Sequence, residues 1–154
     1  MKMGKPIWVF DLDDTLADTS PRAHLHPRLV DDGPGWIPYS MACESDLPIF
    51  ATIEMLNHSP FEVWIVTGRT ELAREFTEKW LEEQDVDYDD MIMRADGDHR
   101  KNVEIKLASL EYFESINRQV VLWVDDYDAV CEAMELRGVS SMHFRPGMRP
   151  NDRW

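Results

Sequence analysis

Short apolar runs alternate with longer amphipathic stretches along the chain, and this alternation predicts strands separated by helices. The runs that predict buried strands are residues 7–10, 61–66, 91–93, 120–124 and 139–144. Strands separated by helices in this way form a parallel sheet that is covered on both faces. The pattern therefore predicts an α/β protein with a three-layer α/β/α, Rossmann-like architecture and a parallel five-stranded sheet.

The stretches between these runs carry signals for helix ends. Helices often begin at a side chain that caps the first turn, and often end at a glycine. The first predicted helix begins at Ser45 and reaches about residue 57. The second begins at Thr70 and has Leu72, Phe76, Trp80 and Leu81 on one face, and the third begins at Asn102 and has Ile105, Leu110 and Phe113 on one face. The fourth covers 128–137 and ends before Gly138. Pro48 would be tolerated in the first turn of the first of these helices.

Residues 17–46 differ from the rest of the chain in their content of proline and glycine. Both residue types interrupt regular structure, so the stretch is predicted to be mostly loop. A loop of this length is long enough to lie over an active site. Trp36 and Tyr39 within it would suit stacking on a nucleobase, although ordinary packing is the favoured interpretation of both.

Length and composition fit a single domain over residues 1–154, because no linker-like change in composition divides the chain. The longest uninterrupted apolar run, 120–124, is far shorter than the roughly 20 residues that a membrane helix needs. The N-terminal residues lack the apolar core of a signal peptide. Cys43 and Cys131 are far apart in sequence, which is typical of reduced thiols. We therefore expect a cytoplasmic protein without membrane contact.

The chain is strongly acidic. Sixteen Lys and Arg residues stand against thirty Asp and Glu residues, for a formal net charge of −14. This balance argues against broad, non-specific adhesion to nucleic acid. Any phosphorylated ligand would therefore have to be held by local positive charge.

Carboxylate, hydroxyl and amine side chains follow the predicted strands in a fixed order. The order is DLDDTL at 11–16, TGR at 67–69, Lys106, and VDD at 124–126. Ligands of an open parallel sheet bind beyond the carboxyl ends of its strands. Asp11, Thr67 and Asp125 fall at that edge, so the sequence predicts a site there.

The first motif suits phosphoryl transfer. Asp11 and Asp13 are two residues apart on an extended segment, so both side chains can face one ligand. One carboxylate can attack phosphorus to give an aspartyl-phosphate. A neighbouring acid can then protonate the leaving oxygen and later activate water.

The other motifs supply the groups that a phosphate and a metal ion require. Thr67 offers a hydroxyl and backbone donors to phosphate oxygens, and Lys106 offers a compact positive charge. Asp125 and Asp126 offer the hard oxygen ligands that Mg²⁺ prefers. Such an ion would allow two anions, the nucleophile and the phosphate, to approach each other.

The ordered set resembles the haloacid dehalogenase (HAD) superfamily of aspartyl-phosphate phosphatases, from the first to the fifth predicted strand. The resemblance implies a HAD-like fold in which Asp11 is the nucleophile, Asp13 is the general acid and base, and Thr67 and Lys106 bind phosphate. It also implies Mg²⁺ as the cofactor, held by Asp11, the carbonyl of Asp13 and Asp125, with Asp126 supporting through water. The absence of a large insertion between the motifs implies little or no cap domain, and therefore an open site.

Further residues resemble the phosphatase domain of phage polynucleotide kinase/phosphatase, which removes 3′-phosphates from nucleic acid ends. They are Arg22, eleven residues after Asp11, the segment MRADGDHRKN at 93–102, and Arg69. The resemblance implies that substrate is bound by Arg22, Gly68, Arg69 and Arg94. The sequence departs from that family at Asn102, where an aspartate is expected, and it contains no GxxxxGK[ST] phosphate loop of a kinase.

The resemblance therefore predicts a magnesium-dependent phosphatase that removes a 3′-phosphate from a nucleic acid end or a nucleotide. A 5′-nucleotidase or another small phosphomonoesterase of the superfamily is an alternative, and the negative net charge favours small substrates. A non-catalytic nucleotide-binding module is a second alternative, against which the Asp11 and Asp13 pair argues. A response-regulator receiver is rejected, because here the acidic pair follows the lysine. No protein partner is predicted, and the oligomeric state stays open.

Each of these residues also has a structural interpretation. The aspartates at the strand ends could cap turns, and Arg22, Arg69 and Arg94 could each form ion pairs at the surface. Three carboxylates beside Thr67 and Lys106 favour a site over a set of caps.

Overall fold

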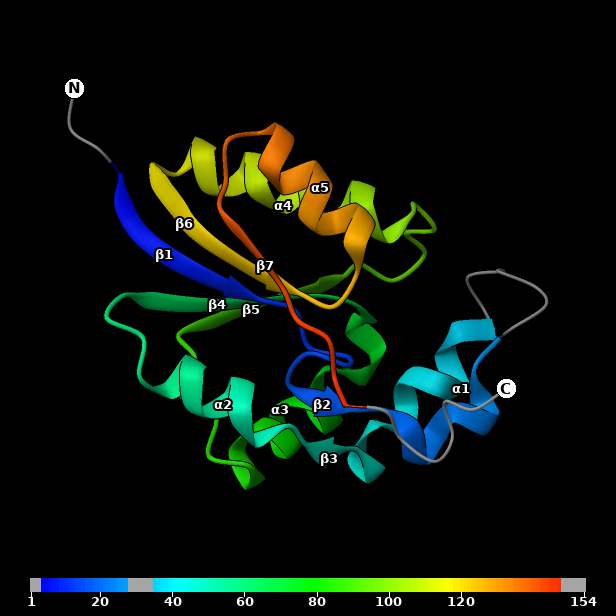
Figure 1. Ribbon diagram of the computed structural model, residues 1–154. Coiled ribbons are helices and arrows are strands. Elements are labelled where there is room, and N and C mark those ends of the chain that lie inside the picture. The colour runs from blue at the N-terminus through cyan, green and yellow to red at the C-terminus, as the bar shows by residue number, and fades with distance from the viewer. Residues whose placement is uncertain (1–3, 28–34, 148–154) are drawn as a thin grey trace.

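The computed structural model describes residues 4–27 and 35–147 and contains a five-stranded parallel sheet (Figure 1). Its strands are β1 (Lys5–Phe10), β4 (Glu62–Thr70), β5 (Asp90–Arg94), β6 (Arg118–Asp125) and β7 (Ser141–His143). Their order across the sheet is β5-β4-β1-β6-β7, and every neighbouring pair is parallel. The predicted sheet is confirmed, with β1 at its centre.

Helices cover both faces of this sheet. The helices α2 (Phe50–Asn57) and α3 (Arg74–Glu83) lie on one face, and α4 (Asn102–Ser115) and α5 (Asp128–Leu136) lie on the other (Figure 1). Neighbouring residues of β1 point to opposite faces, because the side chains of a strand alternate. Val9 packs with Leu110 and Phe113 of α4, whereas Phe10 packs with Trp80 of α3. The predicted three-layer α/β/α architecture is confirmed.

The predicted helix start at Ser45 is wrong. Ser45 ends a 3-10 turn, η3 (Cys43–Ser45), and is followed by the short strand β3 (Leu47–Pro48). This strand pairs antiparallel with β2 (Ala17–Asp18). Pro48 disfavours the helical conformation of the residue before it, so α2 begins only at Phe50.

Two other helices begin differently from the predictions. Thr70 caps a 3-10 turn, η4 (Glu71–Ala73), by accepting a hydrogen bond from the Leu72 amide at 3.3 Å, and α3 follows from Arg74. Leu72 consequently lies at the surface instead of in the core. Asn102 is the first residue of α4 and not its cap; the Glu104 side chain accepts a hydrogen bond from the Lys101 amide at 2.8 Å there.

Residues 17–46 contain several short elements where the sequence predicted mostly loop. The elements are β2, the 3-10 helix η1 (Ser20–Leu25), α1 (Trp36–Met41) and η3. Residues 28–34 of the predicted loop lie outside the described residues. Among the described residues, only these short elements and β3 lie between β1 and α2, and they form no cap domain.

None of the helices in the described ranges is both long enough and apolar enough to span a membrane.

Candidate active site

Three carboxylates and one amine meet where the central strands end. Asp11 directly follows β1, and Asp125 ends the neighbouring strand β6. The Lys106 amine, from the first turns of α4, donates to Asp11 Oδ1 at 2.6 Å and to Asp125 Oδ2 at 2.5 Å. Asp126 completes the group. The first motif, Lys106 and the last motif therefore come together at this edge.

The buried carboxylates are held by neutral donors as well. Thr15 Oγ1 donates to Asp11 Oδ2 at 3.1 Å. Asp125 accepts from Trp123 Nε1 at 3.2 Å and from the Tyr127 amide at 3.1 Å. These contacts orient both carboxylates without the help of a ligand.

The local charge of the cluster favours a cation. Burial and the charge of Asp125 raise the pKa of Asp11 well above its ordinary value, although Lys106 opposes this. Burial also raises the pKa of Asp126 to about 6. Burial alone would lower the pKa of Lys106, but Asp11 and Asp125 raise it overall, so the amine stays charged. One lysine therefore does not neutralise three carboxylates.

The donor set fits a magnesium ion. One oxygen from each of Asp11, Asp125 and Asp126 lies within 4.8 Å of the others. Carboxylate oxygens are the ligands that this hard ion prefers. The group comprises three of the four residues expected to bind the metal; the fourth, Asp13, was expected to contribute its backbone carbonyl.

The TGR motif forms a bulge at the end of β4. The pairing with β5 passes from Thr67 opposite Met93 to Thr70 opposite Arg94, so Gly68 and Arg69 are additional residues on β4. Bulges bend a strand and redirect its side chains. Thr67 Oγ1 accepts from the Arg69 amide at 3.0 Å within the bulge.

The guanidinium of Arg69 points inward to Asp13. Arg69 Nη2 contacts Asp13 Oδ1 at 2.5 Å and Asp46 Oδ2 at 3.1 Å. Arg22 binds the same two carboxylates, with Nη2 at 2.7 Å from Asp13 Oδ1 and Nε at 2.7 Å from Asp46 Oδ1. Two arginines and two aspartates therefore form one cluster beside the carboxylate group.

This cluster controls the charge of Asp13. Burial alone would raise the pKa of Asp13, but Arg69 and Arg22 lower it to about 2. Asp13 is therefore held as an anion. The two arginines stabilise the ionised form of Asp13, so its carboxylate would gain a proton only if these ion pairs weaken.

Both arginines are buried, at 0% exposure for Arg22 and 2% for Arg69. Arg22 also lies over the Tyr39 ring, 4.2 Å from its centroid, and donates to the Tyr39 carbonyl at 2.9 Å. The structure thus gives both side chains protein partners, and their contact with a substrate stays a prediction.

Asp46 is a residue of the site that the sequence reasoning missed. It lies between η3 and β3, belongs to no motif, and is 5% exposed. Its carbonyl accepts from Trp80 Nε1 at 2.8 Å, which anchors the segment to α3. No local pattern singles Asp46 out, because its partners Arg22 and Arg69 are 24 and 23 residues away in the chain.

Replacing Asp46 by asparagine is expected to lower the free energy of unfolding by about 2–3 kcal/mol, because two buried guanidiniums lose a charged acceptor. For a domain of this size the melting temperature should fall by roughly 5–10 °C in a calorimeter. Glu71→Gln is the matched control, since the pair of Glu71 with Arg74 is partly exposed and its loss should cost under about 1 kcal/mol. Equal shifts for the two variants would contradict a structural role of Asp46.

Arg94, the last of the predicted substrate-binding residues, contacts backbone carbonyls. Its Nε donates to the Gly68 carbonyl at 2.9 Å, across the bulge. Gly68 itself lies close to Asn102, because a Cβ added to Gly68 would be 2.5 Å from Asn102 Oδ1.

The two loop aromatics pack against each other. Trp36 and Tyr39 lie edge to face with ring centroids 5.5 Å apart, and each also contacts the His26 ring. Tyr39 is 7% exposed. Packing, the interpretation favoured from the sequence, describes both residues.

The fold and the site together define a class: a HAD-like α/β domain with an ordered set of aspartates, a threonine and a lysine at the carboxyl edge of its sheet. A family model described as the polynucleotide kinase PNKP phosphatase domain matches residues 5–147. The match covers almost the whole chain, and the protein belongs to this family of HAD phosphatases. No curated protein matches the sequence.

Solved structures resemble the fold at low sequence identity. A chain from the "Structure of the Pnkp1/Rnl/Hen1 RNA repair complex" superposes with a TM-score of 0.72 at 20% identity, over 94% of this chain and 43% of that one. A second structure of the Pnkp1/Rnl/Hen1 complex gives 0.69 at 23% identity, over 90% of this chain and 44% of that one. A hydrolase from Streptococcus pneumoniae TIGR4 gives 0.57 at 14% identity, over 93% and 94% of the two chains. The protein thus spans less than half the length of the Pnkp1-complex chains that it resembles.

Proposed function

We propose that the protein is a magnesium-dependent phosphatase that removes a 3′-phosphate from a nucleic acid end or a nucleotide through an aspartyl-phosphate. The observation that carries this proposal is the buried group of Asp11, Asp125 and Lys106, with Asp13 just beyond β1 and Thr67 near the end of β4. The family match supports the reaction class. The resemblance to a structure from an RNA repair complex supports a nucleic acid substrate.

In the first half of the reaction, a carboxylate oxygen of Asp11 attacks phosphorus. The Asp11 oxygen–phosphorus bond forms as the bond between phosphorus and the leaving oxygen breaks. Lys106 would bind the same phosphoryl group, and the contact of its amine with Asp11 supports this role. A bound magnesium ion would supply the positive charge that offsets repulsion between the carboxylates and the phosphate.

The leaving oxygen needs a proton, and Asp13 is proposed to give it. For this step the carboxyl of Asp13 must be protonated, and so must leave the two arginines that lower its pKa to about 2. In the second half, water attacks phosphorus and passes a proton to Asp13, and the bond to Asp11 breaks to release phosphate. Asp13 is ionised while it is paired with the two arginines, so its carboxylate has no proton of its own when water attacks.

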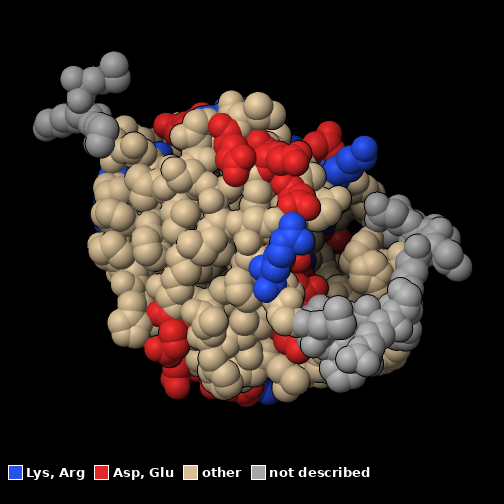
Figure 2. All heavy atoms as spheres, viewed as in Figure 1, with Lys and Arg blue, Asp and Glu red and all other residues tan. Residues whose placement is uncertain are grey.

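A 5′-nucleotidase is the second candidate function. The net charge of −14 favours small substrates over a polyanion. Figure 2 shows acidic side chains gathered in several groups on one face, with few basic ones between them. Rates on a 3′-phosphorylated oligonucleotide, a 3′-mononucleotide and a 5′-mononucleotide separate the candidates. We expect the first to be fastest; a preference for the 5′-mononucleotide would refute the proposal.

Magnesium is expected to stabilise the fold in the absence of substrate, because the ion relieves repulsion among two buried carboxylates and the half-buried one of Asp126. At a hundredfold excess over its dissociation constant, a ligand adds about 2.7 kcal/mol. Thermal unfolding with magnesium and with EDTA measures this as a rise of roughly 5–10 °C. In Asp125→Asn the rise should largely disappear. A rise of the same size in that variant would place the ion elsewhere.

A further inference from the structure

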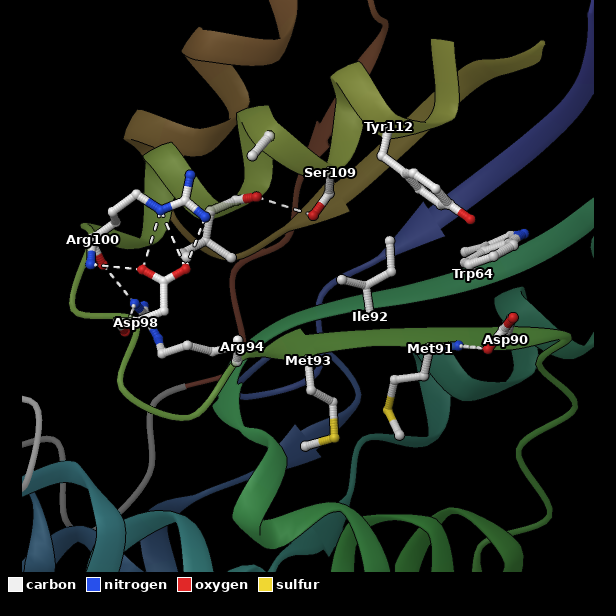
Figure 3. Close-up of a pocket in the computed structure, with 13 residues that line it drawn as sticks. Trp64, Asp90, Met91, Ile92, Met93, Arg94, Asp98, Arg100, Ser109 and Tyr112 are labelled. Carbon is white, nitrogen blue, oxygen red and sulfur yellow. Dashed lines mark hydrogen bonds and ion pairs between the residues drawn. The ribbon is translucent and has the colours of Figure 1, made fainter. Parts of the chain in front are cut away.

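Arg94 joins two catalytic segments through their backbones. It ends β5 and lies opposite Thr70, just past the bulge at Gly68 and Arg69. Its Nε donates to the Gly68 carbonyl at 2.9 Å, on the TGR side. Its Nη1 donates to the carbonyls of Asp98 at 3.1 Å and Arg100 at 2.5 Å, on the loop that leads into α4. Figure 3 shows the Arg94 side chain reaching from β5 toward this loop.

A second contact joins the same two segments. A Cβ at Gly68 would lie 2.5 Å from Oδ1 and 3.2 Å from Cγ of Asn102, so any other residue there would have to displace the Asn102 side chain. Asn102 begins α4, and Lys106 follows one turn later on the same helix. The position of the bulge relative to α4 therefore sets how Thr67 and Lys106 face each other.

We propose that Arg94 is a positioning residue that fixes the TGR bulge to the start of α4 and so sets the spacing of Thr67 and Lys106. The inference rests on the proposed phosphatase function, in which those two groups hold the phosphoryl group. An arginine suits this task because its planar guanidinium offers several donors in fixed directions, whereas a lysine amine is a single point. The role differs from the substrate contact that the family resemblance implies for Arg94.

Direct contact of Arg94 with the substrate, the alternative role, also has a basis in the structure. A groove of about 470 Å³ continues from Arg94 between β5 and α4, with Ile92, Trp64 and Tyr112 along it (Figure 3). A nucleic acid strand lying in that groove would contact Arg94 directly. The test must therefore separate an effect on the phosphoryl site from an effect on strand binding.

The experiment compares Arg94→Ala, Arg94→Lys and Arg100→Ala on two substrates, p-nitrophenyl phosphate and a 3′-phosphorylated oligonucleotide. Arg100→Ala removes a charge from the same groove, where Arg100 forms a pair with Asp98 and its side chain is 54% exposed, and it keeps the backbone carbonyl. Small displacements of catalytic groups cost up to about 100-fold in rate. We expect both Arg94 variants to lose about 10- to 100-fold in kcat on both substrates, with KM changed little. Added guanidinium should restore part of kcat to Arg94→Ala, and Arg100→Ala should retain the wild-type kcat on p-nitrophenyl phosphate.

A loss confined to the oligonucleotide, seen as a raised KM, would overturn the inference in favour of direct binding, and so would an unchanged kcat. Amide hydrogen exchange decides the matter independently of turnover. In Arg94→Ala, exchange should rise together at residues 67–70 and 101–106, and in Arg100→Ala it should not. If the wild type hydrolyses only p-nitrophenyl phosphate, the proposal of a nucleic acid substrate is refuted, but the effect of the Arg94 variants on that ester still tests the inference. If the wild type hydrolyses neither substrate, the proposed function fails, and unchanged exchange in Arg94→Ala would overturn the inference as well.

Discussion

Replacing Asp11 by asparagine is expected to abolish turnover, with a loss on the order of 10⁴-fold or more, and to leave the fold intact. The reason is chemical, because an amide oxygen does not form the covalent bond to phosphorus that a carboxylate forms. The fold should persist because the single side-chain oxygen of asparagine can still accept from Lys106, and its amide nitrogen can donate to the Thr15 hydroxyl, which can turn to accept. Steady-state rates and thermal unfolding of the same preparation measure both expectations.

Asp14→Asn is the matched control for this substitution. Asp14 lies three residues further along, accepts hydrogen bonds from Thr19, and has no role in the proposed chemistry. The control should retain most of the activity. Substantial activity in Asp11→Asn would show that another group is the nucleophile.

Replacing Lys106 by methionine is expected to remove activity and to destabilise the protein strongly. The Lys106 side chain is fully buried between two carboxylates, and removing one partner of a buried ion pair typically costs about 3–5 kcal/mol. Methionine fills much of the same volume, so the loss should arise from charge more than from packing. Chemical denaturation measures the change in the free energy of unfolding.

Magnesium provides a further check on Lys106→Met. Because the ion would supply positive charge to the same carboxylates, the destabilisation should be smaller with magnesium than with EDTA. Lys101→Met, at an exposed position five residues earlier and just before α4, is the control and should change stability by less than about 0.5 kcal/mol. A small effect of Lys106→Met under both conditions would contradict the electrostatic description of the site.

The sheet and the main site could be predicted from the sequence because both depend on short-range patterns. Buried strands appear as apolar runs, and the residues that directly follow them must lie at one edge of a parallel sheet. This reasoning predicts that Asp11 and Asp125 lie at one edge of the sheet, and in the structure both carboxylates accept a hydrogen bond from Lys106. Thr67 follows the same logic, since it lies near the end of β4.

The helix starts were predicted less well because capping signals are local, whereas tertiary contacts decide which of them is used. Ser45 has the chemistry of a cap, but the pairing of β3 with β2 takes up the residues that follow it. Asn102 likewise has capping chemistry, yet it lies one residue inside α4 and packs against Gly68.

The surroundings of Asp13 could not be predicted because they depend on contacts between distant segments. Asp46 meets Arg22 and Arg69 only after the loop and the bulge have folded together. The directions of Arg69 and Arg94 follow from the bulge, which no periodicity in the sequence indicates.

Asn102 marks the clearest departure from the family resemblance. Its Oδ1 is buried and has no hydrogen-bond partner among the described residues. An aspartate at this position would place a negative charge beside the Gly68 turn and within reach of Arg94, whose Nη2 lies 3.4 Å from the position of a Gly68 Cβ. Asparagine keeps the shape of that contact without the charge.

One measurement tests the central claim most directly: the fate of an oligonucleotide that carries a phosphate at each end, with the two phosphates labelled differently. Both phosphates are then offered at the same concentration to the same enzyme with magnesium. Our proposal predicts that the 3′-phosphate is released and the 5′-phosphate is retained, and that Asp11→Asn releases neither. Preferential release of the 5′-phosphate, or release of neither by wild-type protein that is folded and supplied with magnesium, would contradict it.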